Sequence, residues 1–243
     1  TYLAVMQNGA PAHSPDEVDY NIIIDNPQWD ICGKLNRGEI DEIWLYGAPY
    51  FGFYESTLVG PGAYLYNSPP LTATHGCNKL MPIMGLSYER GVADAVHSFG
   101  HRTEASMTKA YGGWEENRTA HNWDRFGLVK AQSPNYTYSG CGSVHFPPNG
   151  LAGYDYGNPG STLTNCEDFS NYPNLSDPLL VAQPITCAAW NCDHLSYMIY
   201  WFSHLPSNMG CGSDAVENNW WPYFADPNLA LFPSLNCPPV SPG

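Results

Sequence analysis

The stretch that decides the fold is Ser87-Tyr-Glu-Arg-Gly-Val-Ala-Asp-Ala-Val-His-Ser-Phe-Gly-His-Arg-Thr-Glu-Ala105. It follows a short apolar run over residues 80–86, and the two segments together predict a strand, a turn and then a helix over 89–111. Spacings of three, four and three residues place four ionisable side chains on one face of that helix: Asp94, His97, His101 and Glu104. Charged residues make up only 13% of the chain, so this face is the first candidate for chemistry.

Other segments extend this pattern into an α/β fold. The apolar run 42–46 predicts a buried strand. Residues 19–36 predict a helix that is interrupted near Pro27, and residues 193–204 predict a second helix. The segments 47–70 and 112–184 are rich in turn-forming residues, and we interpret them as loops. We therefore expect a partly parallel sheet with packed helices and long loops that disulfides pin in place.

The 243-residue chain is long enough for a sizeable core, and we expect a single domain. Its α/β half would span 1–112, and its loop-rich half would span 113–243 with one helix near 193–204. Nine basic residues against 23 acidic ones give a formal charge of −14, which argues against binding to nucleic acid or to an anionic membrane. No apolar run reaches the length of a membrane span, and an initial Thr fits a processed chain or a fragment.

Eight cysteines are scattered along the chain without a Cys-x-x-Cys pair, so disulfides are favoured over a metal site of thiolates. Such bonds persist in oxidising compartments, which predicts a secreted, extracellular protein. Three Asn-x-Ser/Thr sequons, at Asn117, Asn135 and Asn174, are compatible with a glycoprotein. The pairing of the cysteines is left open, because eight cysteines allow about 105 connectivities.

Glu55 is the leading candidate for a catalytic group. It is the only acid between Glu42 and Glu89, and aromatic residues surround it in the sequence Tyr50-Phe-Gly-Phe-Tyr54. An apolar environment favours the protonated form of a carboxylic acid, so Glu55 would suit general acid catalysis. The alternative is a carboxylate capped by backbone amides of the glycine-rich loop.

The predicted helix offers a second candidate. His97 and His101 have the His-x-x-x-His spacing that lets two imidazoles bind one metal ion, and Glu104 or Asp94 would add a carboxylate. Ser98, however, stands where zinc proteases carry a glutamate directly after the first histidine. An exposed polar helix face is the favoured interpretation for His97. Glu89 is interpreted first as an acid at the helix N-terminus, with Arg90 as its partner.

Two further segments combine polar groups with aromatic rings, as sugar-binding sites do. The loop 144–156 contains His145, Asn149 and Asp155. The segment 217–224 contains Asn218 and Trp220, although an ordinary core role is the alternative for the tryptophan.

Six short segments together resemble a family of uncharacterised secreted microbial proteins: Gly52-Phe-Tyr-Glu-Ser, Asn67-Ser-Pro-Pro, Tyr88-Glu-Arg-Gly, Phe99-Gly-His-Arg-Thr-Glu, His145-Phe-Pro-Pro-Asn and Asn218-Asn-Trp-Trp. The resemblance extends from about Val18 to Trp221. It brings no established activity and no catalytic residues. Some members of the family are attached to carbohydrate-binding or fibronectin-like modules, so the resemblance favours polysaccharide chemistry. It also implies that the domain starts upstream of Thr1 and that this chain lacks a leading strand.

Our leading hypothesis is a secreted carbohydrate-active hydrolase, most specifically a glycoside hydrolase that uses a pair of carboxylates on a polysaccharide or oligosaccharide. It requires no metal and no cofactor. The catalytic candidates are Glu55, Glu104, His101 and Glu89. The substrate-binding candidates are Tyr50, Tyr54, Arg90, His145, Asn149, Asp155, Asn218 and Trp220. The alternatives are a metal-dependent hydrolase that uses His97, His101 and Glu104, and a polysaccharide-binding protein without catalysis.

Overall fold

The computed structural model of the chain describes residues 2–12, 14, 16–49, 51–115 and 117–237. These residues form two compact units, Thr1–Arg102 and Thr103–Gly243. The boundary between the units lies within one helix, α4 (Val92–Tyr111). The expectation of a single domain stays a prediction. Among the described residues, none of the helices combines the length and the apolar character needed to cross a bilayer.

The first unit is built on a three-stranded mixed sheet with the order β1-β3-β2. Strand β1 (Ile43–Gly47) is parallel to β3 (Met81–Ser87), and β2 (Ser56–Val59) is antiparallel to β3. The strands predicted at 42–46 and 80–86 are confirmed to within a residue, as is the partly parallel sheet. The sequence did not indicate β2, which lies in the segment that we interpreted as a loop.

One face of this sheet carries a hydrophobic core covered by short helices. The interruption predicted near Pro27 within 19–36 is confirmed, because this segment forms two helices, α2 (Tyr20–Ile24) and α3 (Ile31–Asn36). Helix α1 (Tyr2–Asn8) precedes both. Ile24 and Leu35 pack in one buried cluster with Val59, Met81 and Ile83 of the strands. A disulfide between Cys32 and Cys77 fastens α3 to the segment that leads into β3. Apolar burial and this bond therefore fix β3 in place.

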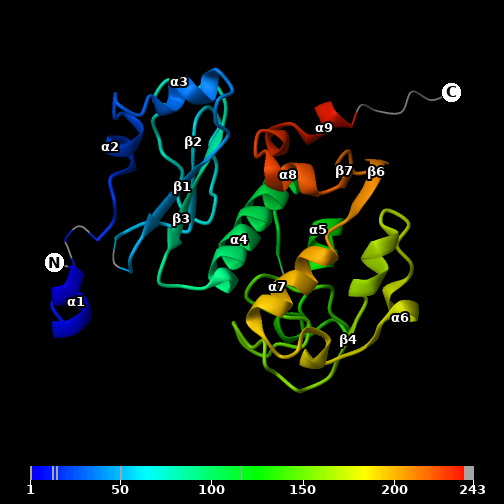
Figure 1. Cartoon of the computed structure of the whole chain (residues 1–243). Coiled ribbons are helices and arrows are strands. Elements are labelled where there is room, and N and C mark those ends of the chain that lie inside the picture. Colours follow the sequence, from blue (N-terminus) through cyan, green and yellow to red (C-terminus); the bar gives the residue numbers. More distant parts are fainter. Residues whose placement is uncertain (1, 13, 15, 50, 116, 238–243) are drawn as a thin grey trace. The chain divides into compact units, whose positions relative to one another are not determined.

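The other face of the sheet meets the first turns of α4 (Figure 1). Side chains alternate along β1, so that Ile43 and Leu45 pack against the core cluster while Trp44 turns the other way. The ring of Trp44 lies 5.5 Å from the ring of Phe99 on α4. The helix begins three residues later than predicted, because residues 88–91 form the turn that follows β3. This turn brings the N-terminus of α4 to the carboxyl edge of the sheet.

The second unit combines helices with two small antiparallel sheets, β4-β5 and β6-β7. Its strands are β4 (Thr162–Thr164), β5 (Gln183–Ile185), β6 (Ser207–Cys211) and β7 (Glu217–Asn219). Its α-helices after α4 are α5 (Asn122–Gly127), α6 (Pro178–Val181), α7 (His194–Ser203), α8 (Trp221–Ala225) and α9 (Pro233–Asn236). Short 3₁₀ segments are η1 (Lys130–Gln132), η2 (Cys166–Asn171), η3 (Cys187–Trp190) and η4 (Leu229–Leu231). The helix predicted over 193–204 is confirmed as α7.

An aromatic core holds the second unit together. Trp123 is fully buried, and its ring lies between 5.5 and 6.3 Å from those of Phe126, Trp201 and Trp220. Most of these contacts are edge-to-face or tilted, which the quadrupoles of the rings favour. Much of the high aromatic content of the chain is therefore used in packing.

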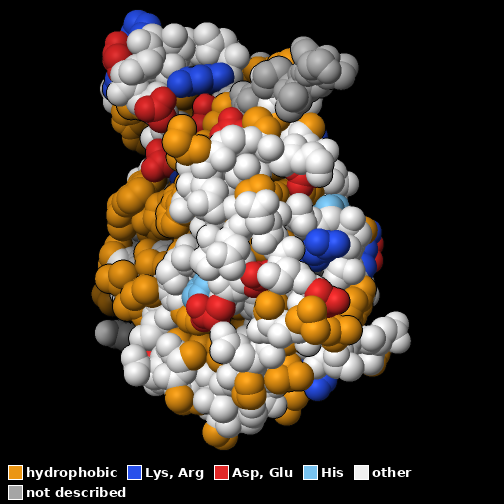
Figure 2. All heavy atoms as spheres, turned by 90° about the vertical axis from the view of Figure 1, so that its right-hand side faces the viewer, with side chains coloured by type: hydrophobic (Ala, Val, Ile, Leu, Met, Phe, Trp, Pro, Cys, Tyr) orange, Lys and Arg blue, Asp and Glu red, His pale blue; other side chains and the backbone are white. Residues whose placement is uncertain are grey.

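The eight cysteines form four disulfides, as the sequence predicted. In addition to the bond in the first unit, they join Cys141 to Cys166, Cys187 to Cys192 and Cys211 to Cys237. The long disulfide-pinned loops are not confirmed, because the segment 112–184 contains α5, β4, α6 and two of the 3₁₀ segments. The fold is a mixture of helices and strands with one small mixed sheet, broader than a single α/β class. On the face drawn in Figure 2, acidic and basic side chains are scattered among hydrophobic and uncharged ones.

Candidate functional site

A cleft of about 720 Å³ opens in the first unit at the carboxyl ends of β1 and β3. This volume is within the range of small-molecule sites. Aromatic side chains line much of it: Trp44, Tyr46, Phe51, Phe53, Tyr88 and Phe99. The polar lining includes Glu55, Arg90, Asp94 and Ser98. The cleft thus combines exposed rings with two carboxylates and one guanidinium group.

Two glycines allow the loop after β1 to close over the end of the sheet. A Cβ atom at Gly85 in β3 would lie 2.2 Å from the carbonyl oxygen of Tyr54. A Cβ atom at Gly47, the last residue of β1, would lie 2.7 Å from the rings of Phe51 and Phe53. Any larger residue at either position would push the loop away. These glycines therefore determine where the residue after this loop, Glu55, is placed.

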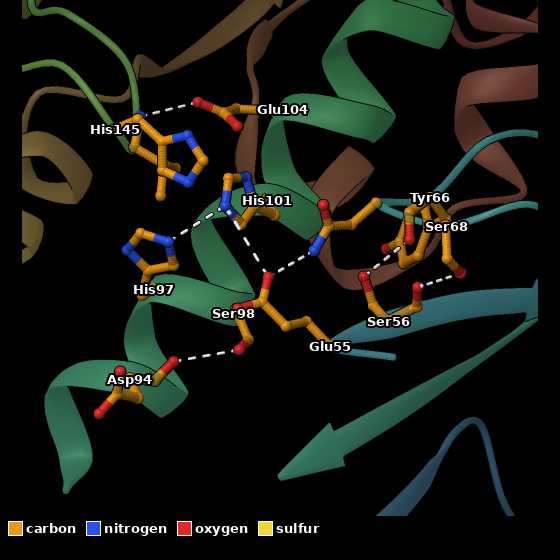
Figure 3. A network of polar contacts seen from close by, with 12 residues as sticks. Glu55, Ser56, Tyr66, Ser68, Asp94, His97, Ser98, His101, Glu104 and His145 are labelled. Carbon is orange, nitrogen blue, oxygen red and sulfur yellow. Dashed lines mark hydrogen bonds and ion pairs between the residues drawn. The ribbon is translucent and has the colours of Figure 1, made fainter. Parts of the chain in front are cut away.

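Glu55 is the centre of a small polar network in the first unit (Figure 3). Its Oε2 atom accepts a hydrogen bond from Nδ2 of Asn67 and lies 3.8 Å from Nε2 of His101 on α4. The side chain of Glu55 is 40% exposed and that of His101 is 11% exposed, so solvent reaches the carboxylate more than the imidazole. An imidazole facing a carboxylate is a pair that can transfer a proton.

The start of β2 holds the Asn67 loop close to Glu55. Ser56 donates its hydroxyl hydrogen to the carbonyl oxygen of Tyr66, and Ser68 donates to the carbonyl oxygen of Ser56. Ser56 and Ser68 are buried, and Asn67 between these anchors adopts a left-handed backbone with φ of 63°. Asparagine tolerates that conformation better than most residues. The amide of Asn67 is thereby held where its nitrogen donates to the carboxylate of Glu55.

The two histidines of α4 contact each other. The distance between their Nε2 atoms is 3.1 Å, and their rings are 4.7 Å apart. The expectation of an exposed polar face is wrong for His97, which is only 5% exposed. On the preceding turn, Asp94 pairs with Arg90 at 3.5 Å, and both line the cleft. The helix face identified in the sequence is therefore partly buried at His97 and open at Asp94.

Glu104 has a different role from the one predicted. It is 8% exposed and lies in the second unit, where its Oε1 atom accepts a hydrogen bond from the backbone nitrogen of Val144 at 2.7 Å. A buried carboxylate that binds a backbone amide stabilises the position of that segment. Glu104 is therefore engaged in holding the loop 143–146, which leaves Glu55 as the better placed of the two proposed catalytic glutamates.

Of the other predicted site residues in the first unit, some line the cleft and others lie outside it. Arg90 lines the cleft, whereas Glu89 is exposed and is not one of its lining residues. Tyr54 packs against the core cluster, where its ring stacks on Tyr20, so its position does not suit a sugar platform in the cleft. A hydrogen bond to the carboxylate of Glu17 raises the pKa of Tyr54. Tyr50 lies outside the described residues.

The candidates of the second unit are mostly tied into local structure. His145 is bonded to the hydroxyl group of Tyr154 at 2.8 Å, and Asp155 accepts from the backbone nitrogen of Leu151. Asn149 donates to the carbonyl oxygens of Asn158 and Gly160, and Asn218 donates to that of Met209. These bonds are typical of residues that fix loops.

Trp220 is fully buried in the aromatic core of the second unit, so the structure corrects its predicted role as a platform for a sugar. A ring without accessible surface has no face on which a sugar can stack.

The cleft also contains residues that the sequence did not single out as binding groups. Trp44, Tyr46 and Tyr88 are between 45% and 60% exposed, although two of them lie on a strand that we predicted to be buried. The alternation of β1 was the available signal, because every second residue of a strand points to the opposite face. Asn67 was quoted only as part of a resemblance, and its contact with Glu55 depends on the pairing of β2.

Comparison of the chain with protein-family models, with curated proteins and with solved structures found no match.

Proposed function

We propose that this protein is a carbohydrate-active hydrolase whose substrate lies in the cleft of the first unit, with Glu55 as its proton-transferring residue. The observation that carries the proposal is the placement of Glu55 in the wall of an aromatic cleft, 3.8 Å from the imidazole of His101. Exposed rings stack on the C–H faces of sugars, and the nearby carboxylates and guanidinium group suit hydroxyl groups.

Three side chains of the polar network would each have a distinct role in catalysis. Glu55 would exchange a proton with the substrate or with a water molecule, and His101 would exchange a proton with Glu55 through their close contact. Asn67 would hold the Oε2 atom of Glu55 in position. Since the carboxylate is 40% exposed, substrate can reach it from the cleft.

The more specific proposal is a glycoside hydrolase, which needs a second carboxylate across the scissile bond. Asp94 is the other acid among the described residues that line the cleft, and it replaces Glu104 in this role. Its side chain lies 3.5 Å from the guanidinium group of Arg90, which also lines the cleft.

We also propose that the protein acts outside the cell. Four disulfides that use all eight cysteines are typical of proteins from oxidising compartments, where polysaccharide substrates are accessible.

The test is hydrolysis of a panel of plant, fungal and bacterial polysaccharides by the wild type, by Glu55→Gln and by Glu167→Gln. The Glu167 variant is a matched control, because Glu167 also faces an imidazole, that of His204 at 3.1 Å, but does not line the cleft. We expect Glu55→Gln to lower kcat by at least about 100-fold, in the range of general acid–base catalysis, with an unchanged melting temperature. Full activity of this variant would remove Glu55 from the mechanism, and binding without any product would favour a polysaccharide-binding protein.

A further inference from the structure

The two imidazoles of α4 approach each other through the atoms that bind metals. His97 and His101 are four residues apart on the helix, and their Nε2 atoms are separated by 3.1 Å. The ligand atoms of the two rings lie within 4.8 Å of each other, close enough to bind the same metal ion. Two nitrogens that each lie about 2.0–2.1 Å from a tetrahedral Zn²⁺ are about 3.3 Å apart. The spacing of the pair is therefore close to that of two ligands on one ion.

The charges around this pair also suit a cation. Glu55 faces the same Nε2 atom of His101, and none of the ion pairs among the described residues gives it a lysine or arginine partner. Arg102 of α4 is paired with Glu42, and Arg90 in the turn before α4 is paired with Asp94. A divalent cation beside the imidazoles would balance the charge of the Glu55 carboxylate.

We propose that His97 and His101 are two of the ligands of a bound Zn²⁺ ion, and that Glu55 faces the water molecule on that ion. In zinc sites with two histidines one turn apart, a glutamate commonly accepts the proton of the metal-bound water. Here the residue after His97 is Ser98, and Glu55 at the start of β2 supplies the carboxylate instead. A metal ion was excluded from our leading hypothesis but belonged to its alternative, in which Glu104 supplied the carboxylate; here Glu55 takes that place.

The site would open directly into the proposed substrate cleft. Glu55, Ser98 and Phe99 line the cleft, and the two histidines flank Ser98 and Phe99 on the helix. The metal would lower the pKa of its bound water, and the proton lost on forming hydroxide would pass to the carboxylate of Glu55. This catalytic role rests on the proposed function, with one change: Nε2 of zinc-bound His101 binds the ion and no longer exchanges a proton with Glu55. The metal site itself does not rest on the proposed function.

The first experiment measures metal binding without any reaction. Metal-stripped full-length protein is titrated with Zn²⁺ against a competing chromophoric chelator, and bound zinc is counted by elemental analysis after dialysis. We expect about one zinc per chain. His97→Ala and His101→Ala should each weaken the affinity by more than the roughly 10–100-fold that loss of an outer-shell partner costs. His204→Ala is the control, since His204 is also an imidazole paired with a glutamate and should leave affinity unchanged.

Because replacing the buried His97 can unfold the protein, zinc binding is also measured on the wild type by NMR. Zinc bound through Nε2 should shift the ¹⁵N resonances of two imidazoles, and the same titration of His204→Ala should give the same two shifts. Zinc binding that shifts no imidazole nitrogen, or affinity that survives in folded His97→Ala and His101→Ala variants, would overturn the proposal.

The Glu55→Gln variant tests whether Glu55 is a ligand of the ion or faces its bound water. Glu55→Gln should keep zinc within about 10-fold of the wild-type affinity while losing hydrolysis, because its carboxylate faces the water rather than the ion. Loss of zinc comparable with that of the histidine variants would make Glu55 a ligand and overturn its assigned role. Hydrolysis by a protein that binds no zinc would overturn the metal site and leave the proposed function intact. Zinc bound through both histidines without hydrolysis of any polysaccharide would support the site and reject the proposed function.

Discussion

Glu55 and His101 approach to 3.8 Å, Oε2 to Nε2, although one residue precedes β2 and the other is on the third turn of α4. Their contact is produced by three local features. Pairing of β2 with β3 fixes the start of β2, and glycines at 47 and 85 let the preceding loop pack closely. Helix α4 presents the imidazole to the carboxylate (Figure 3). A carboxylate and an imidazole are thus held together at an accessible cleft, as proton transfer requires.

Removing the amide of Asn67 should disturb catalysis without disturbing the fold. In Asn67→Gly the backbone can keep its φ of 63°, but Glu55 loses its hydrogen-bond donor. A carboxylate that is less well oriented should lower kcat by roughly 10- to 100-fold, with little change in melting temperature. Steady-state kinetics against the best substrate of the panel measure the effect.

Asn191→Gly is the matched control for this variant. Asn191 also has a positive φ, of 53°, but it lies in the second unit and is not a lining residue of the cleft. Equal activity of both variants would show that Asn67 does not orient the catalytic carboxylate.

The exposed rings of the cleft should contribute to substrate affinity. Tyr46 is 58% exposed, so Tyr46→Ala removes a stacking surface at little cost to packing. An aromatic contact is worth about 0.5–1.5 kcal/mol, and its loss should raise KM by roughly 2- to 10-fold while kcat stays the same. Affinity electrophoresis in gels that contain the polysaccharide gives an independent measure. Unchanged KM and mobility in both Tyr46→Ala and Tyr88→Ala would show that the substrate binds elsewhere.

The sequence predicts those parts of the fold whose signal is local. Strands β1 and β3 are continuous apolar runs, and α4 and α7 have clear helical patterns, so all four elements were found, with only the start of α4 placed three residues too early. Strand β2 has only four residues, beginning Ser-Thr, and it is stabilised by pairing with β3 rather than by its own pattern. A long-range pairing of this kind leaves no periodic signal in a short segment.

The candidate site shows the same division between local and long-range information. Glu55 and His101 were each identified from their surroundings in the sequence, but the contact between them requires the sheet register and could not be predicted. Trp44 was predicted to lie in a buried strand but is 45% exposed. Trp220 was predicted to be an accessible sugar platform but is fully buried. Composition indicates that rings are abundant, but it does not say which ring a neighbouring element covers.

Trp220→Ala should therefore destabilise the second unit rather than weaken substrate binding. The Trp220 ring is fully buried against Trp123, Phe126 and Tyr172, and truncation of such a residue costs about 3–5 kcal/mol. Chemical denaturation followed by tryptophan fluorescence and circular dichroism measures the loss. Its neighbour Trp221 is 38% exposed, so Trp221→Ala is the matched control and should cost clearly less. Equal costs for the two variants would contradict the packing described for Trp220.

His121 should make the second unit less stable in mild acid. Its Nδ1 atom accepts a hydrogen bond from the backbone nitrogen of Asp124 and caps α5, which requires this nitrogen to be unprotonated. Burial lowers the pKa of His121, and Arg118 adds to this effect, whereas the carboxylates of Asp124 and Asp214 oppose it. In the unfolded chain the imidazole regains an ordinary pKa near 6.5.

The sign of the effect follows from the protons bound by each state. Below about pH 6.5 the unfolded chain binds a proton at His121 that the folded chain does not, so the free energy of unfolding falls as the pH decreases toward the folded pKa. The slope that this one proton contributes is at most about 1.4 kcal/mol per pH unit, and it vanishes well above pH 6.5.

His121→Asn keeps a side-chain oxygen that can cap the helix but does not titrate. Denaturation between pH 5 and 8 should therefore show a steeper acid loss for the wild type than for the variant, with similar stabilities at pH 8. Parallel curves would show that His121 titrates alike in both states.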